Sequence, residues 1–278
     1  MFELRQIDTS TPQAVLDQIV RCEAVHAVCG PRDLWRRLQA DRRCYALFSP
    51  EAPDEPLIFT EIALSRGITG DVSAILETES RIEAPESCDC AMFYSISRCQ
   101  DRSSSIPLGN TLIRQVITRV QRELPSIRTF ATVSPVPGFG RWLADLAARS
   151  DGALATVVAA LDDARWRHDQ RASRRLEATL LPLCASYLVY AKRGSEPLDS
   201  VARFHLANGA QLGRLHWLGD RTPAGLARSV GITANYLYEL DRVEANAEAY
   251  GRTHEVLASP EIKMIAAKNA DDCRGHAA

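Results

Sequence analysis

AMFYSIS, at Ala91–Ser97, and IRTFATV, at Ile127–Val133, bracket the stretch that decides the fold of this chain. Both runs are rich in β-branched and aromatic residues, which predicts strands. Between them Asn110 is a good helix cap, and apolar residues then recur with helical spacing at Leu112, Ile113, Val116, Ile117 and Val120. Strand, polar loop, helix and strand make a β-loop-α-β unit, which predicts an α/β domain.

Upstream of this unit the pattern predicts two helices and two further strands. Thr11-Pro12 reads as a helix start, and Asp33–Leu38 as a second short helix with Trp35 on its buried side. Cys44–Phe48 and Leu57–Leu64 are rich in strand-forming residues, with turn residues between them. We therefore expect an antiparallel run of strands before the β-loop-α-β unit.

Downstream, the sequence predicts one clear turn, one strand and four helices. Asn208-Gly209 is a strong turn signal ahead of a predicted strand, Gln211–Leu218. Four helices are predicted, at Gly138–Arg149, Arg171–Lys192, Pro223–Val230 and Thr233–Asn246. The whole pattern predicts an α/β (α+β) fold with a mixed central sheet flanked by helices.

Composition limits the classes of function. The 278 residues are 46% hydrophobic and 24% charged, as in ordinary globular proteins. The net charge of −2 gives no global attraction to nucleic acid or to an anionic membrane, so an anionic substrate needs a locally basic pocket. No apolar run approaches the roughly 20 residues that span a bilayer, and Met1–Ser10 is not a signal peptide.

The eight cysteines do not form a metal motif. None has Cys-x-x-Cys spacing, and the one close pair, Cys88-Asp89-Cys90, has no second pair of ligands nearby. We therefore expect no metal site. Free thiols without a secretion signal indicate the reducing cytoplasm.

Three short blocks carry candidate chemistry, each at the edge of a predicted element. They are Ser134-Pro135-Val136-Pro137-Gly138-Phe139, His205-Leu206-Ala207-Asn208-Gly209-Ala210 and Ala234-Asn235-Tyr236-Leu237-Tyr238. In the same order, these blocks resemble the catalytic domain of malonyl-CoA decarboxylases, and a looser likeness runs from about Glu23 to about Tyr250. Three blocks in order are far more specific than one short motif.

The resemblance implies a fold related to acetyltransferases of the GNAT type and a reaction from malonyl-CoA to acetyl-CoA and carbon dioxide. No cofactor is implied, because the thioester carbonyl accepts the electron pair. The expected organisation is a short helical segment over 1–22, a catalytic domain over 23–266 and a disordered tail over 267–278. Larger relatives also carry an N-terminal helical domain that they use in forming their oligomers, and we expect this domain to be missing here. We therefore expect a monomer or a small homo-oligomer.

By resemblance, Ser134, His205 and Tyr238 are the catalytic residues. Taken alone, Ser134 is a turn serine; the family motif gives it a hydrogen bond to the malonyl group. His205 matches the residue that protonates the enolate, and an ordinary histidine pKa near 6.5 suits proton exchange at neutral pH. Tyr238 matches an active-site tyrosine, although a Tyr-x-Tyr on a helix is also compatible with packing alone.

The polar loop before the predicted helix is the expected coenzyme A site. Backbone N–H groups at such a junction bind phosphate well, and the family holds the coenzyme A pyrophosphate there. Proline has no N–H to donate, so Pro107 departs from relatives that place a carboxylate at that position. The loop residues expected to bind substrate are Ser104, Ser105, Ile106, Pro107, Leu108, Gly109 and Asn110.

Two alternatives stay open. The same fold is compatible with decarboxylation of malonyl groups on an acyl carrier protein, and with transfer of an acyl group to an amine. A second class is a DNA-binding regulator, since Gly225–Leu240 has the spacing of a helix-turn-helix. Its second helix holds Glu239 and Asp241 against Arg242, which phosphates would repel, so we expect no nucleic-acid partner and no membrane partner.

Overall fold

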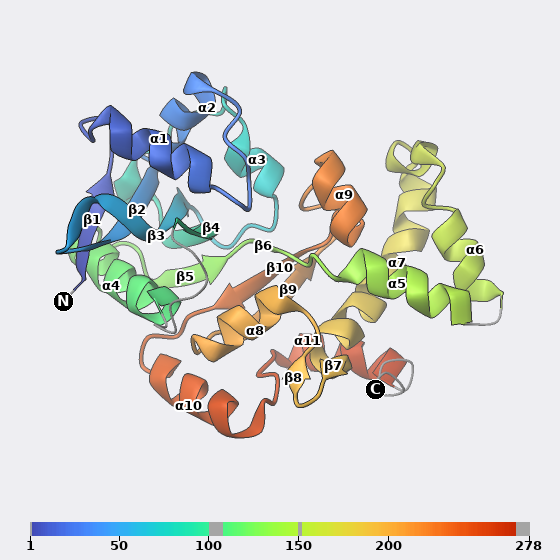
Figure 1. Cartoon of the computed structure of the whole chain (residues 1–278). Helices are drawn as coiled ribbons and strands as arrows, with labels where there is room; N and C mark the ends of the chain where they lie inside the picture. The colour runs from blue at the N-terminus through green and yellow to red at the C-terminus, as the bar shows by residue number, and fades with distance from the viewer. Residues whose placement is uncertain (1, 100–107, 150–151, 271–278) are drawn as a thin grey trace. The chain divides into compact units, whose positions relative to one another are not determined.

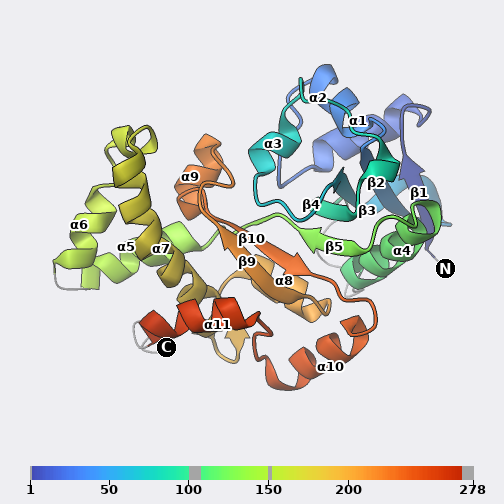
Figure 2. The ribbon, with the colours of Figure 1, turned by 180° about the vertical axis from the view of Figure 1, so that it is seen from behind.

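A computed structural model describes residues 2–99, 108–149 and 152–270 (Figures 1 and 2). The chain divides into two compact units, Met1–Val133 and Ser134–Ala278. Each unit contains β-strands with helices packed on them. The two are described in turn.

The first unit is built on five strands in the order β1-β2-β3-β4-β5. Neighbours from β1 to β4 are antiparallel and β4 pairs with β5 in parallel, so the expected mixed sheet is present. The elements are β1 (Glu3–Ile7), α1 (Gln13–Cys22), α2 (Pro31–Arg37), β2 (Arg42–Ser49), β3 (Ala52–Ser65), α3 (Val72–Leu76), η1 (Pro85–Ser87), β4 (Cys90–Arg98), α4 (Leu108–Glu123) and β5 (Thr129–Thr132).

Alternation along β2 places two cores on opposite faces of this sheet. Cys44, Ala46 and Phe48 pack with the buried side of α1. Tyr45 points to the other face, where its hydroxyl reaches Glu123 on α4. The strand, helix and following strand of the predicted unit are confirmed, although the described helix starts at Leu108 and Asn110 therefore lies inside it instead of capping it.

Helix α2 corrects an expectation about its buried side. Trp35 is 53% exposed, whereas Arg36 and Arg37 are buried. Arg37 donates to Asp33 at 2.8 Å and to Glu61 on β3 at 2.9 Å. Buried, hydrogen-bonded ion pairs fix this helix on the sheet, and such pairing is what lets arginine enter a core.

Cys22 and Cys99 form a disulfide, which corrects the expectation that all thiols are free. The two residues lie 77 positions apart, at the end of α1 and just after β4, with Cα atoms 5.0 Å apart. That separation is within the ordinary range for a disulfide, and no local spacing signals it.

The second unit is built around three antiparallel strands, paired in the order β6-β10-β9. Its other elements are mostly helical (Figure 2). The elements are β6 (Ser134–Pro135), α5 (Phe139–Arg149), α6 (Ala153–Ala159), η2 (Ala164–Arg167), α7 (Gln170–Tyr190), β7 (Lys192–Arg193), β8 (Glu196–Pro197), α8 (Ser200–Ala207), β9 (Gln211–His216), α9 (Pro223–Ser229), β10 (Thr233–Leu237), α10 (Val243–Thr253), α11 (Pro260–Ala266) and η3 (Ala267–Asn269).

The predicted helix over Thr233–Asn246 is wrong. Thr233–Leu237 is the strand β10, paired with β9 on one side and β6 on the other, and a helix begins only at Val243. Tertiary pairing overrides the helical spacing, because Thr233–Tyr236 are buried between neighbouring strands. The helical pair required for a helix-turn-helix is therefore not formed.

Candidate active site

Three elements of the second unit bring Ser134, His205 and Tyr238 together. Ser134 opens β6 and pairs with Ala234 of β10, while Tyr238 follows β10 directly. The ladder of β10 with β9 shifts register between Asn235 and Tyr236, a bulge that changes which way the following side chains point. His205 lies in the last turn of α8, which packs on β9.

Helix α8 is fixed at both ends by local chemistry. Asp199 caps its N-terminus, accepting from the N–H groups of Val201 at 3.0 Å and Ala202 at 2.9 Å. The helix ends at the predicted Asn-Gly turn, where Gly209 has φ +82°. A Cβ at Gly209 would lie 2.0 Å from the Val243 carbonyl oxygen, so only glycine fits there.

The three candidate side chains form one hydrogen-bonded chain. The Ser134 Oγ lies 3.0 Å from the His205 Nε2. On the other side of the ring, the His205 Nδ1 lies 2.9 Å from the Tyr238 Oη. All three residues are buried, with His205 only 5% exposed. Both ring nitrogens thus have a hydroxyl partner, which fixes the orientation of the imidazole.

Aromatic rings enclose His205 and set its charge. Tyr236 stacks on the imidazole at 4.5 Å between centroids, and Phe204 packs edge-on at 5.1 Å. Burial lowers the pKa of His205 to about 3, so its ring is neutral at pH 7. This corrects the expected ordinary pKa near 6.5. Burial also raises the pKa of Tyr238, so its phenol keeps its proton.

Asp199 links the serine segment to the histidine helix. Besides capping α8, its Oδ2 accepts from the Gly138 N–H at 3.4 Å and from the Tyr187 hydroxyl at 3.4 Å. Gly138 belongs to the motif that begins at Ser134, and a Cβ there would collide with the Tyr187 hydroxyl. One buried carboxylate therefore holds both segments that carry the site.

The other predicted site residues lie on α4 or outside the described residues. Ser104, Ser105, Ile106 and Pro107 fall outside the described residues. Leu108, Gly109 and Asn110 form the start of α4, with the first two buried. Sequence reasoning missed Asp199 and Tyr236; an aspartate just before a helix is a cap signal that could have identified the first.

Within residues 2–99, 108–149 and 152–270, no group of histidine, cysteine and acidic side chains has the arrangement of a metal site. Over the same residues, no helix combines the length and apolar character needed to cross a membrane.

Comparison with known proteins identifies the family. The model of the malonyl-CoA decarboxylase C-terminal domain matches residues 1–275, so the chain belongs to this family, as the three sequence blocks predicted. The mitochondrial malonyl-CoA decarboxylase of Anser anser anser is 34% identical over 286 residues. That match covers 94% of this chain and 57% of the goose protein, so the chain spans little more than half of its relative.

Solved structures agree on the fold. The crystal structure of malonyl-CoA decarboxylase from Agrobacterium vitis has a TM-score of 0.89 at 40% identity, covering 95% of this chain and 67% of that one. The loading GNATL domain of CurA from Lyngbya majuscula has a TM-score of 0.50 at 12% identity, covering 87% of this chain and 98% of that domain. The second likeness concerns the fold alone and agrees with the expected GNAT-like architecture.

Proposed function

We propose that this chain decarboxylates malonyl-CoA to acetyl-CoA and carbon dioxide. The observation that carries the proposal is the buried chain of hydrogen bonds from Ser134 through His205 to Tyr238. Membership of the malonyl-CoA decarboxylase family supports the choice of substrate. All three residues belong to one chain, and we propose a monomer or small homo-oligomer in which every chain has the complete set.

In the proposed reaction, the bond between the α carbon and the carboxylate of the malonyl group breaks. Its electron pair moves to the thioester carbonyl as an enolate, and carbon dioxide leaves. The α carbon then takes a proton, the enolate returns to a thioester, and the donor regains its proton from water. Donors aimed at the developing oxyanion and a dry environment favour this charge shift.

His205 is proposed to give the proton and Ser134 to hold the malonyl group. If the Tyr238 phenol donates to Nδ1, the remaining ring proton sits on Nε2, on the side of Ser134. The neutral imidazole is still a competent donor, since the enolate carbon of a thioester is strongly basic. A neutral ring also brings no positive charge into the apolar site, which would be costly there.

The segment Ser104–Asn110 is proposed to bind the coenzyme A pyrophosphate, as the family resemblance implies. Malonyl-CoA is therefore the proposed substrate in preference to a malonyl group on a carrier protein. The helix-turn-helix alternative has lost its basis, because Thr233–Leu237 is a strand.

Mass spectrometry of the product tests the proposal. The purified chain is incubated with malonyl-CoA in D₂O, and a parallel reaction uses malonyl-acyl carrier protein. We expect acetyl-CoA with one deuterium in its methyl group, formed faster from malonyl-CoA than from the carrier protein. Free coenzyme A without acetyl-CoA, or turnover of the carrier-bound substrate alone, would reject the proposal.

A further inference from the structure

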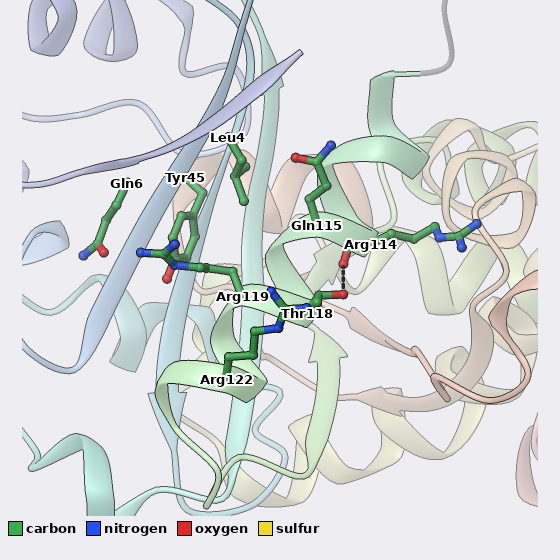
Figure 3. A pocket seen from close by; sticks show the side chains of 8 residues that line it. All are labelled: Leu4, Gln6, Tyr45, Arg114, Gln115, Thr118, Arg119 and Arg122. Carbon is green, nitrogen blue, oxygen red and sulfur yellow. Dashed lines mark hydrogen bonds between the residues drawn. The ribbon is translucent and has the colours of Figure 1, made fainter. Parts of the chain in front are cut away.

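A second candidate binding site lies in the first unit, beside α4. The pocket has a volume of about 440 Å³ and is bordered by β1, β2 and one face of α4 (Figure 3). Pockets of this size accommodate small molecules. The side chains that matter for its chemistry are Gln6, Tyr45, Gln115, Thr118, Arg119 and Arg122.

Arg119 is held in place by a short chain of contacts. The buried Tyr45 hydroxyl donates to Glu123 at 3.0 Å, and the other oxygen of Glu123 accepts from the Arg119 Nε. Figure 3 shows the Arg119 side chain reaching toward Tyr45. Only the Nε is used, so both terminal NH₂ groups lack a protein acceptor within the described part of the chain. A guanidinium fixed in this way loses little freedom when it binds a ligand.

Arg122 adds a second cation one turn further along the helix. It makes no ion pair with any described residue, and in Figure 3 its side chain turns toward Thr118. Arg114 also lines the pocket, but its side chain extends away from the other two arginines. The pocket thus has two cations, Arg119 and Arg122, and one neighbouring carboxylate, Glu123, so it is locally positive in a chain whose net charge is −2.

We propose that this pocket binds a small molecule through a doubly charged oxyanion, either a phosphate or a dicarboxylate. Arginine forks donate pairs of hydrogen bonds to the oxygens of both groups. The amides of Gln6 and Gln115 border the same space and add neutral donors, whereas the Thr118 hydroxyl already donates to the Arg114 carbonyl at 3.0 Å. The site belongs to the first unit, whereas Ser134 and His205 belong to the second, and it does not depend on the proposed decarboxylation.

Calorimetric titration of the whole chain tests this site, with no turnover required. Inorganic pyrophosphate and succinate are titrated separately in about 0.15 M KCl, and acetate serves as the singly charged control. At least one dianion is expected to bind with a Kd below about 1 mM. Arg122→Gln and Arg119→Gln should each weaken it tenfold or more, whereas acetate should give no saturable heat.

Arg66→Gln is the matched control, because it removes the same charge from an exposed arginine of the same unit. It should leave the Kd unchanged. Binding of pyrophosphate alone would identify a phosphate ligand, and binding of succinate alone a dicarboxylate. Absence of binding by both dianions, or equal weakening by Arg66→Gln and Arg122→Gln, would overturn the proposal. Circular dichroism of each variant confirms that the fold is retained.

Discussion

Replacing His205 with glutamine should change how the stability of this protein depends on pH. Burial lowers the pKa of His205 to about 3, against an ordinary value of 6.5. Above pH 6.5 the ring is neutral in the folded and unfolded chains alike. Between pH 6.5 and pH 3 only the unfolded chain binds the proton, so this histidine destabilises the fold as the pH falls.

The magnitude follows from the size of that shift. At pH 5 the solution is about 1.5 pH units below the pKa of this histidine in the unfolded chain. Going from pH 7 to pH 5 therefore lowers the free energy of unfolding by about 2 kcal/mol through His205 alone. Glutamine does not titrate and is expected to lack this term. The free energy of unfolding is measured by urea unfolding at pH 7 and at pH 5. Between these two pH values it should fall by about 2 kcal/mol more in the wild type than in His205→Gln. Equal losses in the two proteins would show that His205 is not buried as a neutral ring.

Three further substitutions probe the supports of the site. Tyr238→Phe removes the phenol beside Nδ1 and should lower kcat about tenfold, the equivalent of one lost hydrogen bond, as measured by acetyl-CoA formation. Asp199→Ala uncouples α8 from Gly138; we expect kcat to fall with KM nearly unchanged, so a rise in KM alone would contradict a positioning role. Gly209→Ala should cost roughly 1–3 kcal/mol of stability through the clash with Val243, whereas Gly251→Ala, with nothing within 4 Å, should cost nothing; urea midpoints compare the two.

Much of the fold could be predicted where local pattern and final environment agree. The strands around Cys44–Phe48, Leu57–Leu64 and Ala91–Ser97 are buried sheet strands, and their composition alone indicated them. The helix pattern after Leu108 worked because one face of α4 packs on the sheet. In these segments the apolar residues are spaced so that they lie on the faces that pack against the rest of the unit.

The failures share a different cause. Thr233–Leu237 is a strand because two distant strands pair with it, and Arg37 is buried because Glu61 lies on another element. The residues next to Thr233–Leu237 and to Arg37 in the sequence do not reveal these distant partners. The Cys22–Cys99 disulfide is equally non-local. Each of these features depends on contacts between segments far apart in the sequence.

The candidate site shows the same division. Ser134, His205 and Tyr238 could be picked out from motifs, but their hydrogen bonds and the neutral state of His205 depend on burial that only the fold provides. The stacking of Tyr236 on the imidazole follows from the strand that sequence reasoning took for a helix. Residue types were therefore predictable, and their electrostatics were not.

The turnover of malonyl-CoA by His205→Gln, measured beside His168→Gln, tests the central claim most directly. Both variants lose a histidine, but His168 is exposed and outside the hydrogen-bonded chain. If His205 donates the proton to the enolate, kcat for acetyl-CoA formation should fall roughly 10²–10⁴-fold in His205→Gln and stay at the wild-type value in His168→Gln. Wild-type turnover by a folded His205→Gln protein would contradict the account.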